Sequence, residues 1–383
     1  MSNLVADFPL VDGIQQNDLV RTLIWLLLFR QSFVTLLLER AHHHGMSTYD
    51  VVIIGGGPAG LGAALTLCRA RRDVLVIDAG TPRNARAGQV HSYLGREGIG
   101  PRELLTIGRA EVEQYGGAFR SGTVADVERI SASTLRLALA DGSTVDARRV
   151  LVATGVVDKL PAIPGLADRW GRDVLHCAYC HAYEVRDKAV GLIGSGAASL
   201  HQAQLWRQWT DRVALFTNDS VELTATSRAE LAARGIAVVS GPVTGIEVSG
   251  DELSGIRVGD TVVSAQVAVV FPVSVAQVGL LAKLGLRAEE QLMDDQIIGA
   301  TVAAENEMGM TTVPGVWVAG NVRGHRAQVI DAAAQGGRTG AMINIDLVNE
   351  DVRHAVAVHP FTPELEAEVT ERVLGVRRHG LTL

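Results

Sequence analysis

The sequence predicts an α/β protein with two Rossmann-like nucleotide-binding domains of the three-layer ββα type, one inserted in the other. The main observation is that a strand, a glycine turn and a helix occur in this order twice, with the first glycines at Gly55 and Gly194. A β-rich segment follows each copy. Strands that alternate with helices in this way indicate parallel sheets. The length of 383 residues accommodates about two to three domains.

Composition narrows the possible functions. Apolar residues make up 47% and charged residues 20% of the chain, which excludes collagen-like, disordered and coiled-coil proteins. The 35 basic and 42 acidic residues give a net charge of −7, so no nucleic-acid partner is expected. Three cysteines are too few for a disulfide scaffold and indicate a reducing, cytoplasmic location. One of them, Cys68, falls in a predicted helix and is interpreted as a buried small residue.

Residues 1–45 differ from the rest and are interpreted as an N-terminal extension. Two apolar runs, 23–29 and 33–38, are separated by Arg30. A membrane span needs ~20 apolar residues, and a central arginine costs ~2.5–3.5 kcal/mol, so membrane contact is not expected. A helix at a membrane surface stays open as an alternative. The other interpretation is an upstream extension before a conventional-looking start at Met46.

The predicted elements then follow in order. A buried strand, a glycine turn and a helix are predicted from YDVVIIGGGPAGLGAALTLCRA, and a second strand, DVLVIDAG, reaches Asp78. Alternating segments in 122–150 predict a hairpin that turns at 141–142. The later elements are an apolar strand at 148–155, a second strand–turn–helix at 188–199, a strand at 212–219, a β-rich stretch at 237–270, a strand at 315–321 and a helix at 326–348.

The first glycine turn, Gly55-x-Gly57-x-x-Gly60, predicts a dinucleotide site. The first glycine permits the tight turn, the second lets a pyrophosphate approach the backbone, and the third lets the helix pack close to the strand. Asp78 follows at the end of the next strand, where a carboxylate would bind a ribose hydroxyl. The alternative is a purely structural turn.

The second turn, Gly194-x-Gly196-x-x-Ser199, departs from this pattern because serine replaces the third glycine. The strand after it ends in FTNDSVEL, which carries Asp219 and Glu222 and no basic residue. A 2′-phosphate would meet an acidic site there, so NADPH is disfavoured. A relic of the fold and an NADH site remain the alternatives.

The pair Cys177 and Cys180, in the segment HCAYCH, is the candidate reactive site. At this spacing two cysteines form a redox disulfide or half of a zinc site. Zinc would need ligands from His176 or His181 in cramped neighbouring positions, so the dithiol is favoured and no metal is predicted. Either imidazole can accept a thiol proton and raise the thiolate fraction. All four residues are therefore assigned as catalytic.

Taken together, the motifs GGGPAG, ATG, a C-x-x-C before a second glycine turn and a late VAG resemble the low-molecular-weight thioredoxin reductase family over about residues 49–350. The resemblance implies bound FAD, with Cys180 near the isoalloxazine, Cys177 toward the substrate, and a homodimer. It implies an FAD domain of residues 46–158 and 276–350, an inserted NAD(P)-type domain of residues 159–275, and a tail of residues 351–383. The implied FAD contacts are Gly55, Gly57, Pro58, Ala59, Gly60, Asp78, Thr154, Gly155, Gly320, Asn321, Gln328 and Val329.

Three departures from the family modify this implication. The residue after the second cysteine is His181 in place of an acid, Asn321 replaces a late aspartate, and the basic 2′-phosphate cluster is missing. These features resemble the thioredoxin-reductase-like dithiol oxidases that close disulfides in gliotoxin- and holomycin-type natural products. The resemblance implies a small dithiol substrate whose electrons pass through the protein disulfide and FAD to O2, without a nicotinamide.

Two other functions stay open at this point. One is a disulfide reductase that is fed by NADH or a donor protein and acts on a thioredoxin-like partner. The other is a flavin-containing redox sensor without turnover. Flavin bleaching by a nicotinamide would identify the reductase, and steady oxygen consumption with a dithiol would exclude the sensor.

Overall fold

The computed structural model describes residues 48–196, 198–293 and 295–375. The predictions for residues 1–45 and for the last residues of the tail lie outside this part. Among the described residues, no helix has the length and hydropathy that crossing a membrane requires.

The first sheet has the strand order β3-β2-β1-β6-β5-β4, and β19 also pairs with β6, along residues 150–152. Its parallel part consists of β1 (Tyr49–Ile54), β2 (Val74–Asp78), β3 (Ala118–Ser121), β6 (Thr144–Val152) and β19 (Val316–Val318). The antiparallel extension consists of β4 (Val124–Arg129) and β5 (Leu135–Leu139), so the predicted hairpin around residues 141–142 is confirmed. The carboxyl ends of β1, β2 and β6 therefore lie side by side.

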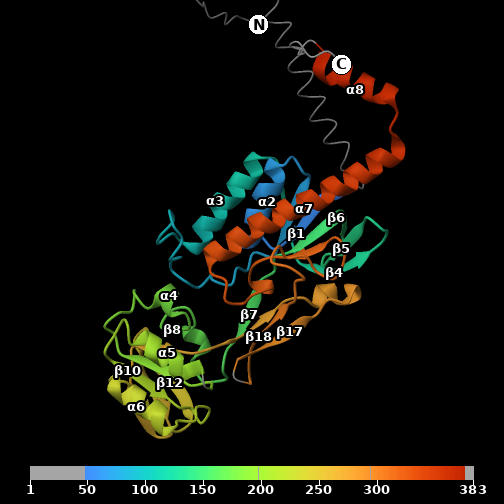
Figure 1. Cartoon of the computed structure of the whole chain (residues 1–383). Coiled ribbons are helices and arrows are strands. Elements are labelled where there is room, and N and C mark those ends of the chain that lie inside the picture. Colours follow the sequence, from blue (N-terminus) through green and yellow to red (C-terminus); the bar gives the residue numbers. More distant parts are fainter. Residues whose placement is uncertain (1–47, 197, 294, 376–383) are drawn as a thin grey trace, which may run out of the picture. The chain divides into compact units, whose positions relative to one another are not determined.

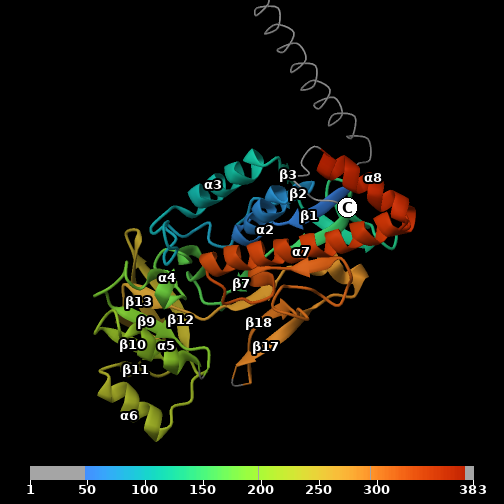
Figure 2. The ribbon, with the colours of Figure 1, turned by 45° about the horizontal axis from the view of Figure 1, so that its top comes forward.

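Three helices cover one face of this sheet (Figure 1): α2 (Pro58–Arg69), α3 (Pro101–Gln114) and α7 (Val329–Val358). Alternate residues of β1 divide between the two faces, as the period of two requires. Val51 and Ile53 pack with the helices, and Val52 packs in the core on the opposite side. Helix α7 lies directly against α2 (Figure 2). The absence of a side chain at Gly336 permits this approach, because a Cβ there would overlap the Ala59 carbonyl.

The second strand–turn–helix builds a separate parallel sheet of order β11-β10-β9-β15-β8. Its strands are β8 (Val174–Leu175), β9 (Val190–Ile193), β10 (Val213–Phe216), β11 (Ala237–Val239) and β15 (Val267–Val269). Its helices are α5 (Ala198–Trp206) and α6 (Ala225–Ala233), and an antiparallel sheet follows with β12 (Val243–Ser249), β13 (Glu252–Val258) and β14 (Thr261–Ser264). The predicted α/β class with two Rossmann-like units is confirmed.

A fourth sheet is built from segments that precede and follow the second Rossmann-like unit (the second unit, residues 174–269). Its order is β17-β18-β16-β7, with β7 (Val156–Lys159), β16 (Val273–Ala276), β17 (Ala288–Met293) and β18 (Gln296–Val302). Strands β7 and β16 pair antiparallel, with Asp158 opposite Ser274. A short helix, α4 (Ala178–His181), carries the second cysteine, and α8 (Pro363–Leu374) follows α7 near the end of the chain.

Candidate functional site

A cavity of about 1070 Å³ opens at the carboxyl ends of the first sheet. Its lining brings together segments that are far apart in the sequence. They are the first glycine turn, the end of β2 with the loop after it, strand β7, the start of α7 and the cysteine helix α4. The volume is of the size that a large nucleotide cofactor needs.

The glycine turn has the geometry that the sequence predicts. Gly55 has a φ of +109°, and a Cβ there would overlap the Ala153 carbonyl. A Cβ on Gly60 would overlap the Gly55 carbonyl, so the third glycine serves the packing of α2 and does not line the cavity. Gly57 has no heavy atom within 4 Å of its Cβ direction, which leaves the backbone open to a phosphate at the N-terminus of α2.

Asp78 lies where a carboxylate that binds a ribose hydroxyl is expected. Its Oδ1 accepts a hydrogen bond of 3.0 Å from the Gly56 amide, and the residue lines the cavity. Thr154 and Gly155 line the same cavity from the end of β6. The turn, the acid and this loop fit the pyrophosphate and ribose of a dinucleotide such as FAD.

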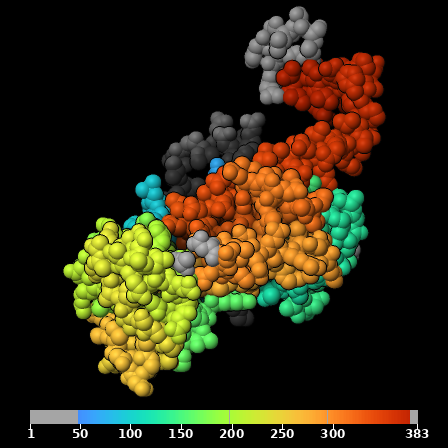
Figure 3. Space-filling view, turned by 60° about the horizontal axis from the view of Figure 1, so that its bottom comes forward, coloured from blue at the N-terminus to red at the C-terminus, as the bar shows by residue number. Residues whose placement is uncertain are grey.

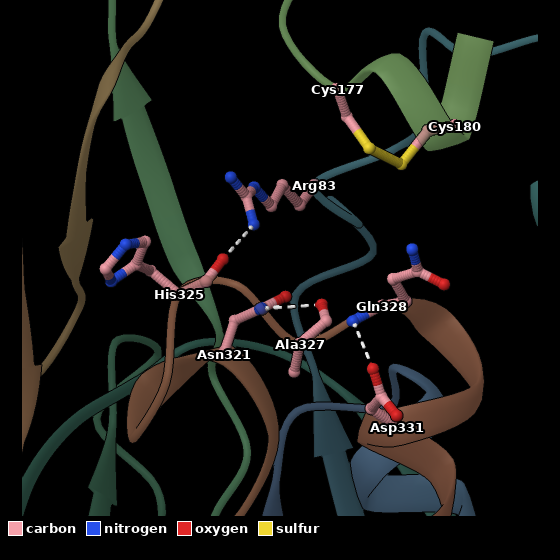
Figure 4. The surroundings of a disulfide bond; sticks show 8 residues. All are labelled: Arg83, Cys177, Cys180, Asn321, His325, Ala327, Gln328 and Asp331. Carbon is pink, nitrogen blue, oxygen red and sulfur yellow. Dashed lines mark hydrogen bonds between the residues drawn. A yellow bond between two sulfur atoms is a disulfide. The ribbon is translucent and has the colours of Figure 1, made fainter. Parts of the chain in front are cut away.

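The start of α7 closes the other end of the cavity. The Asn321 side-chain amide donates to the Ala327 carbonyl at 3.0 Å (Figure 4) and to the Gly324 carbonyl at 3.2 Å. A carboxylate at this position could not donate these bonds. Gln328 and Asp331 form a capping box, in which the backbone amide of Gln328 donates to the Asp331 carboxylate at 3.1 Å. Asn321, Gln328 and Val329 line the cavity, whereas Gly320 does not.

The cysteines form a disulfide in this structure, with their Cα atoms 5.2 Å apart. Cys180 lines the cavity and Cys177 does not, so the two sulfurs differ in what they face. Tyr179, between them, is 62% exposed. Cys68 is free and buried as predicted, and burial raises the pKa of its thiol to about 11.

Both candidate bases lie beside the disulfide and line the cavity. His176 stacks on Trp170 with ring centroids 5.3 Å apart. Burial lowers the pKa of His176 to about 4, and the charge of Arg83 acts in the same direction while Asp158 opposes it. Burial also lowers the pKa of His181, against the opposing charge of Glu184. Both imidazoles are therefore neutral near pH 7, and the pKa of about 4 makes His176 a weak base.

An ion pair in this cavity was not predicted from the sequence. Arg83 Nε and Nη2 donate to the two Asp158 carboxylate oxygens at 2.8 and 2.6 Å. Arg83 Nη1 also donates to the His325 carbonyl at 3.1 Å (Figure 4), and Ser274 Oγ donates to Asp158 at 2.7 Å. Burial alone would raise the pKa of Asp158, but the Arg83 hydrogen bonds and charge lower it. The pair joins the loop after β2 to β7, β16 and the segment before α7.

We expect His176 to make the folded state less stable in acid. Its pKa is about 4 when folded against 6.5 ordinarily, so between these values the unfolded chain binds more protons and stability falls as pH falls. From pH 7 to pH 5 the loss attributable to His176 is about 2 kcal/mol. His176→Phe keeps a ring against Trp170 and removes the titration. Its free energy of unfolding, measured with denaturant, should therefore fall by about 2 kcal/mol less than that of the wild type from pH 7 to pH 5. An identical pH dependence in the two proteins would contradict the assignment.

Fold and cavity together define the class: a flavoprotein-type oxidoreductase in which one cysteine of a disulfide lines a cavity of nucleotide size. The match to a family model is consistent with this class. Residues 49–337 match the model for pyridine nucleotide-disulphide oxidoreductases, and the chain belongs to that family. The predicted resemblance to thioredoxin reductase-like proteins is confirmed.

Individual relatives cover most of the chain. It is 29% identical to "Thioredoxin reductase tcpT" of Claviceps purpurea over 298 residues, which are 73% of this chain and 92% of the relative. Among solved structures, HlmI is 42% identical with a TM-score of 0.74, covering 81% of this chain and 96% of the other. An oxidoreductase from Agrobacterium tumefaciens is 33% identical with a TM-score of 0.73, covering 79% and 99%.

Proposed function

We propose that the protein is an FAD-dependent dithiol oxidase that forms a disulfide in a small-molecule dithiol, with O2 as the electron acceptor. The observation that carries the proposal is that Cys180, the first glycine turn and the start of α7 line one cavity. In this proposal FAD lies in a split domain of residues 46–158 and 276–350, and residues 159–275 form the inserted domain with the cysteines.

The exchange would start at Cys177, which does not line the proposed FAD cavity. A substrate thiolate attacks Cys177 Sγ, the protein disulfide breaks, and Cys180 leaves as a thiolate. The second substrate thiolate then attacks the substrate sulfur of the mixed disulfide and releases Cys177. The substrate has lost two electrons and the cysteine pair has gained them.

Two protons must leave the substrate thiols during this exchange. His176 and His181 are neutral and lie on either side of the cysteines. We assign His181 as the main proton acceptor, because the pKa of about 4 makes His176 a weak base. The charge of Glu184 acts on His181, Glu184 Oε1 lies 3.4 Å from His91 Nε2, and His91 Nδ1 lies 2.6 Å from Glu97 Oε1, so we assign these residues to the outward path of the protons. Both carboxylates are exposed to solvent, which can take up the protons.

Bound FAD would supply the two-electron acceptor that returns the cysteine pair to the disulfide, and O2 would take the electrons from it as hydrogen peroxide. The residues that would hold FAD are Asp78 at a ribose, the turn around Gly57 at the pyrophosphate, and the loop of Asn321 with the start of α7 beside Cys180. A homodimer is part of the proposal through the family resemblance.

The second candidate is a disulfide reductase that takes electrons from a nicotinamide and acts on a thioredoxin-like protein. The relatives favour it, since several of them are named thioredoxin reductases. The acidic end of the second nucleotide-type unit, with Asp219 and Glu222 and no basic residue, weighs against NADPH as its donor.

One pair of measurements separates the two candidates. We expect the FAD-loaded protein to consume O2 steadily with dithiothreitol and to form peroxide in equal amount. Under anaerobic conditions we expect NADPH and NADH to leave the flavin absorbance unchanged. Rapid bleaching by either nucleotide would establish the reductase, and no oxygen consumption with any small dithiol would remove the oxidase.

A further inference from the structure

The second glycine turn, which precedes α5, has no part in the chemistry above. It follows β9, as a dinucleotide-binding turn would. The name of the family to which the chain belongs implies that a pyridine nucleotide binds there. An acid lies 20 residues beyond Ser199, at Asp219, where NAD-type sites hold a ribose hydroxyl. By pattern alone, the turn is an NADH-type site.

The turn is filled by the chain itself. A Cβ placed on Gly196 would overlap all three terminal atoms of the Gln296 amide, Cδ, Oε1 and Nε2. Gln296 Nε2 also donates a hydrogen bond to the Ser195 carbonyl. Gly196 is consequently buried, at the position where the backbone should be open to a pyrophosphate.

The two turns differ at the second glycine. Gly57 has nothing within 4 Å of its Cβ direction, whereas the equivalent Gly196 is covered by the Gln296 amide. The amide before the second glycine is bonded within the protein in both turns, from Gly56 to Asp78 and from Ser195 to Ser199 Oγ, each at 3.0 Å, so it does not distinguish them. The residues present therefore do not fit a pyridine nucleotide.

Gln296 is the first residue of β18 and lies 101 positions from Ser195 in the sequence. The surface of the β17–β18 region (orange) lies beside that of the second unit (yellow-green) in Figure 3. We propose that Gln296 is a specificity-determining residue that closes an NADH-type site and thereby keeps nicotinamides from this protein. The inference concerns binding and holds for either direction of electron flow.

The test is calorimetric titration of the FAD-loaded protein with NAD⁺ and NADP⁺, which bind without electron transfer. Gln296→Ala should bind NAD⁺ at least about ten-fold more tightly than the wild type, since one hydrogen bond and the filled volume no longer compete. Gln291→Ala is the matched control, because this amide lies on the same hairpin and donates to Glu289. It should bind as the wild type does.

Three results would overturn the proposal. Wild-type protein could bind NAD⁺ as tightly as Gln296→Ala, both could fail to bind, or Gln296→Ala could bind NADP⁺ as well as NAD⁺. The last result would place the nucleotide away from Asp219, since an acid there repels a 2′-phosphate. Gln296→Ser serves as a second variant if the alanine variant unfolds. Oxygen consumption with dithiothreitol and no nucleotide tests the oxidase separately, so failure of one proposal leaves the other measurable.

Discussion

Replacing either cysteine by serine should lower dithiol-driven oxygen consumption by about 10³-fold or more. Without Cys177 the substrate has no sulfur to attack, and without Cys180 no protein disulfide can form. Because the two sulfurs act as one unit, the double variant should be no slower than the worse single variant within a few-fold. An oxygen electrode with dithiothreitol as the substrate measures all three proteins.

Cys68→Ala is the matched control, since Cys68 is buried and free. It should keep oxidase activity within a few-fold of the wild type. Thiol titration of the air-oxidised, denatured proteins checks the pairing independently. The wild type should release one thiol, because two of its three cysteines are bonded, and each single serine variant should release two. A serine variant with activity within about ten-fold of the wild type would remove the disulfide from the mechanism.

The parts of the site that could be predicted from sequence are those that a short segment determines by itself. The turn at Gly55 and Gly57, the carboxylate of Asp78 beside it and the pair of Cys177 and Cys180 each follow from local spacing. Asp78 lies 22 residues from Gly56, to which it is hydrogen-bonded, and even this separation is a regular feature of a strand–helix–strand unit.

Contacts across large separations carry no such local signal. Arg83 and Asp158 are 75 positions apart, and neither interrupts a hydrophobic pattern that would mark it as buried. Ser195 and Gln296 are 101 positions apart, and the sequence indicates an imperfect turn but not the side chain that fills it. The sheet that pairs β7 with β16 brings such residues together, and its pairing is a property of the whole fold.

The long helix shows a similar limit at its ends. The prediction was 326–348, whereas α7 begins at Val329 and ends at Val358. The capping box of Gln328 and Asp331 sets the later start. No glycine or proline follows until Pro360, so nothing stops the helix earlier. Helix α8 beyond it was not predicted at all.

Breaking the Arg83–Asp158 ion pair should lower the free energy of unfolding more than breaking any other single ion pair in the cavity wall. The side chain of Asp158 is 6% exposed and that of Arg83 is 23% exposed, so removing one partner leaves the other largely desolvated and unpaired. We expect Asp158→Ala and Arg83→Ala each to lower the free energy of unfolding by about 2–4 kcal/mol at pH 7, after allowance for the partial exposure of the arginine. The double variant should lose less than the sum, because the second substitution removes the orphaned charge.

The matched control is Asp146→Ala, which breaks a pair of the same chemistry on β5 and β6. Arg136 Nε and Nη2 donate to Asp146 at 2.7 and 2.8 Å, but their side chains are 37% and 22% exposed. Its loss should cost only about 0.2–1 kcal/mol. Denaturant unfolding at a fixed FAD concentration gives both values, since FAD bound to the folded state alone would add stability of its own. Equal costs for the two aspartates would mean that water reaches the Arg83–Asp158 pair freely. Arg83 would then not be what fixes the segment before α7 against the cavity wall.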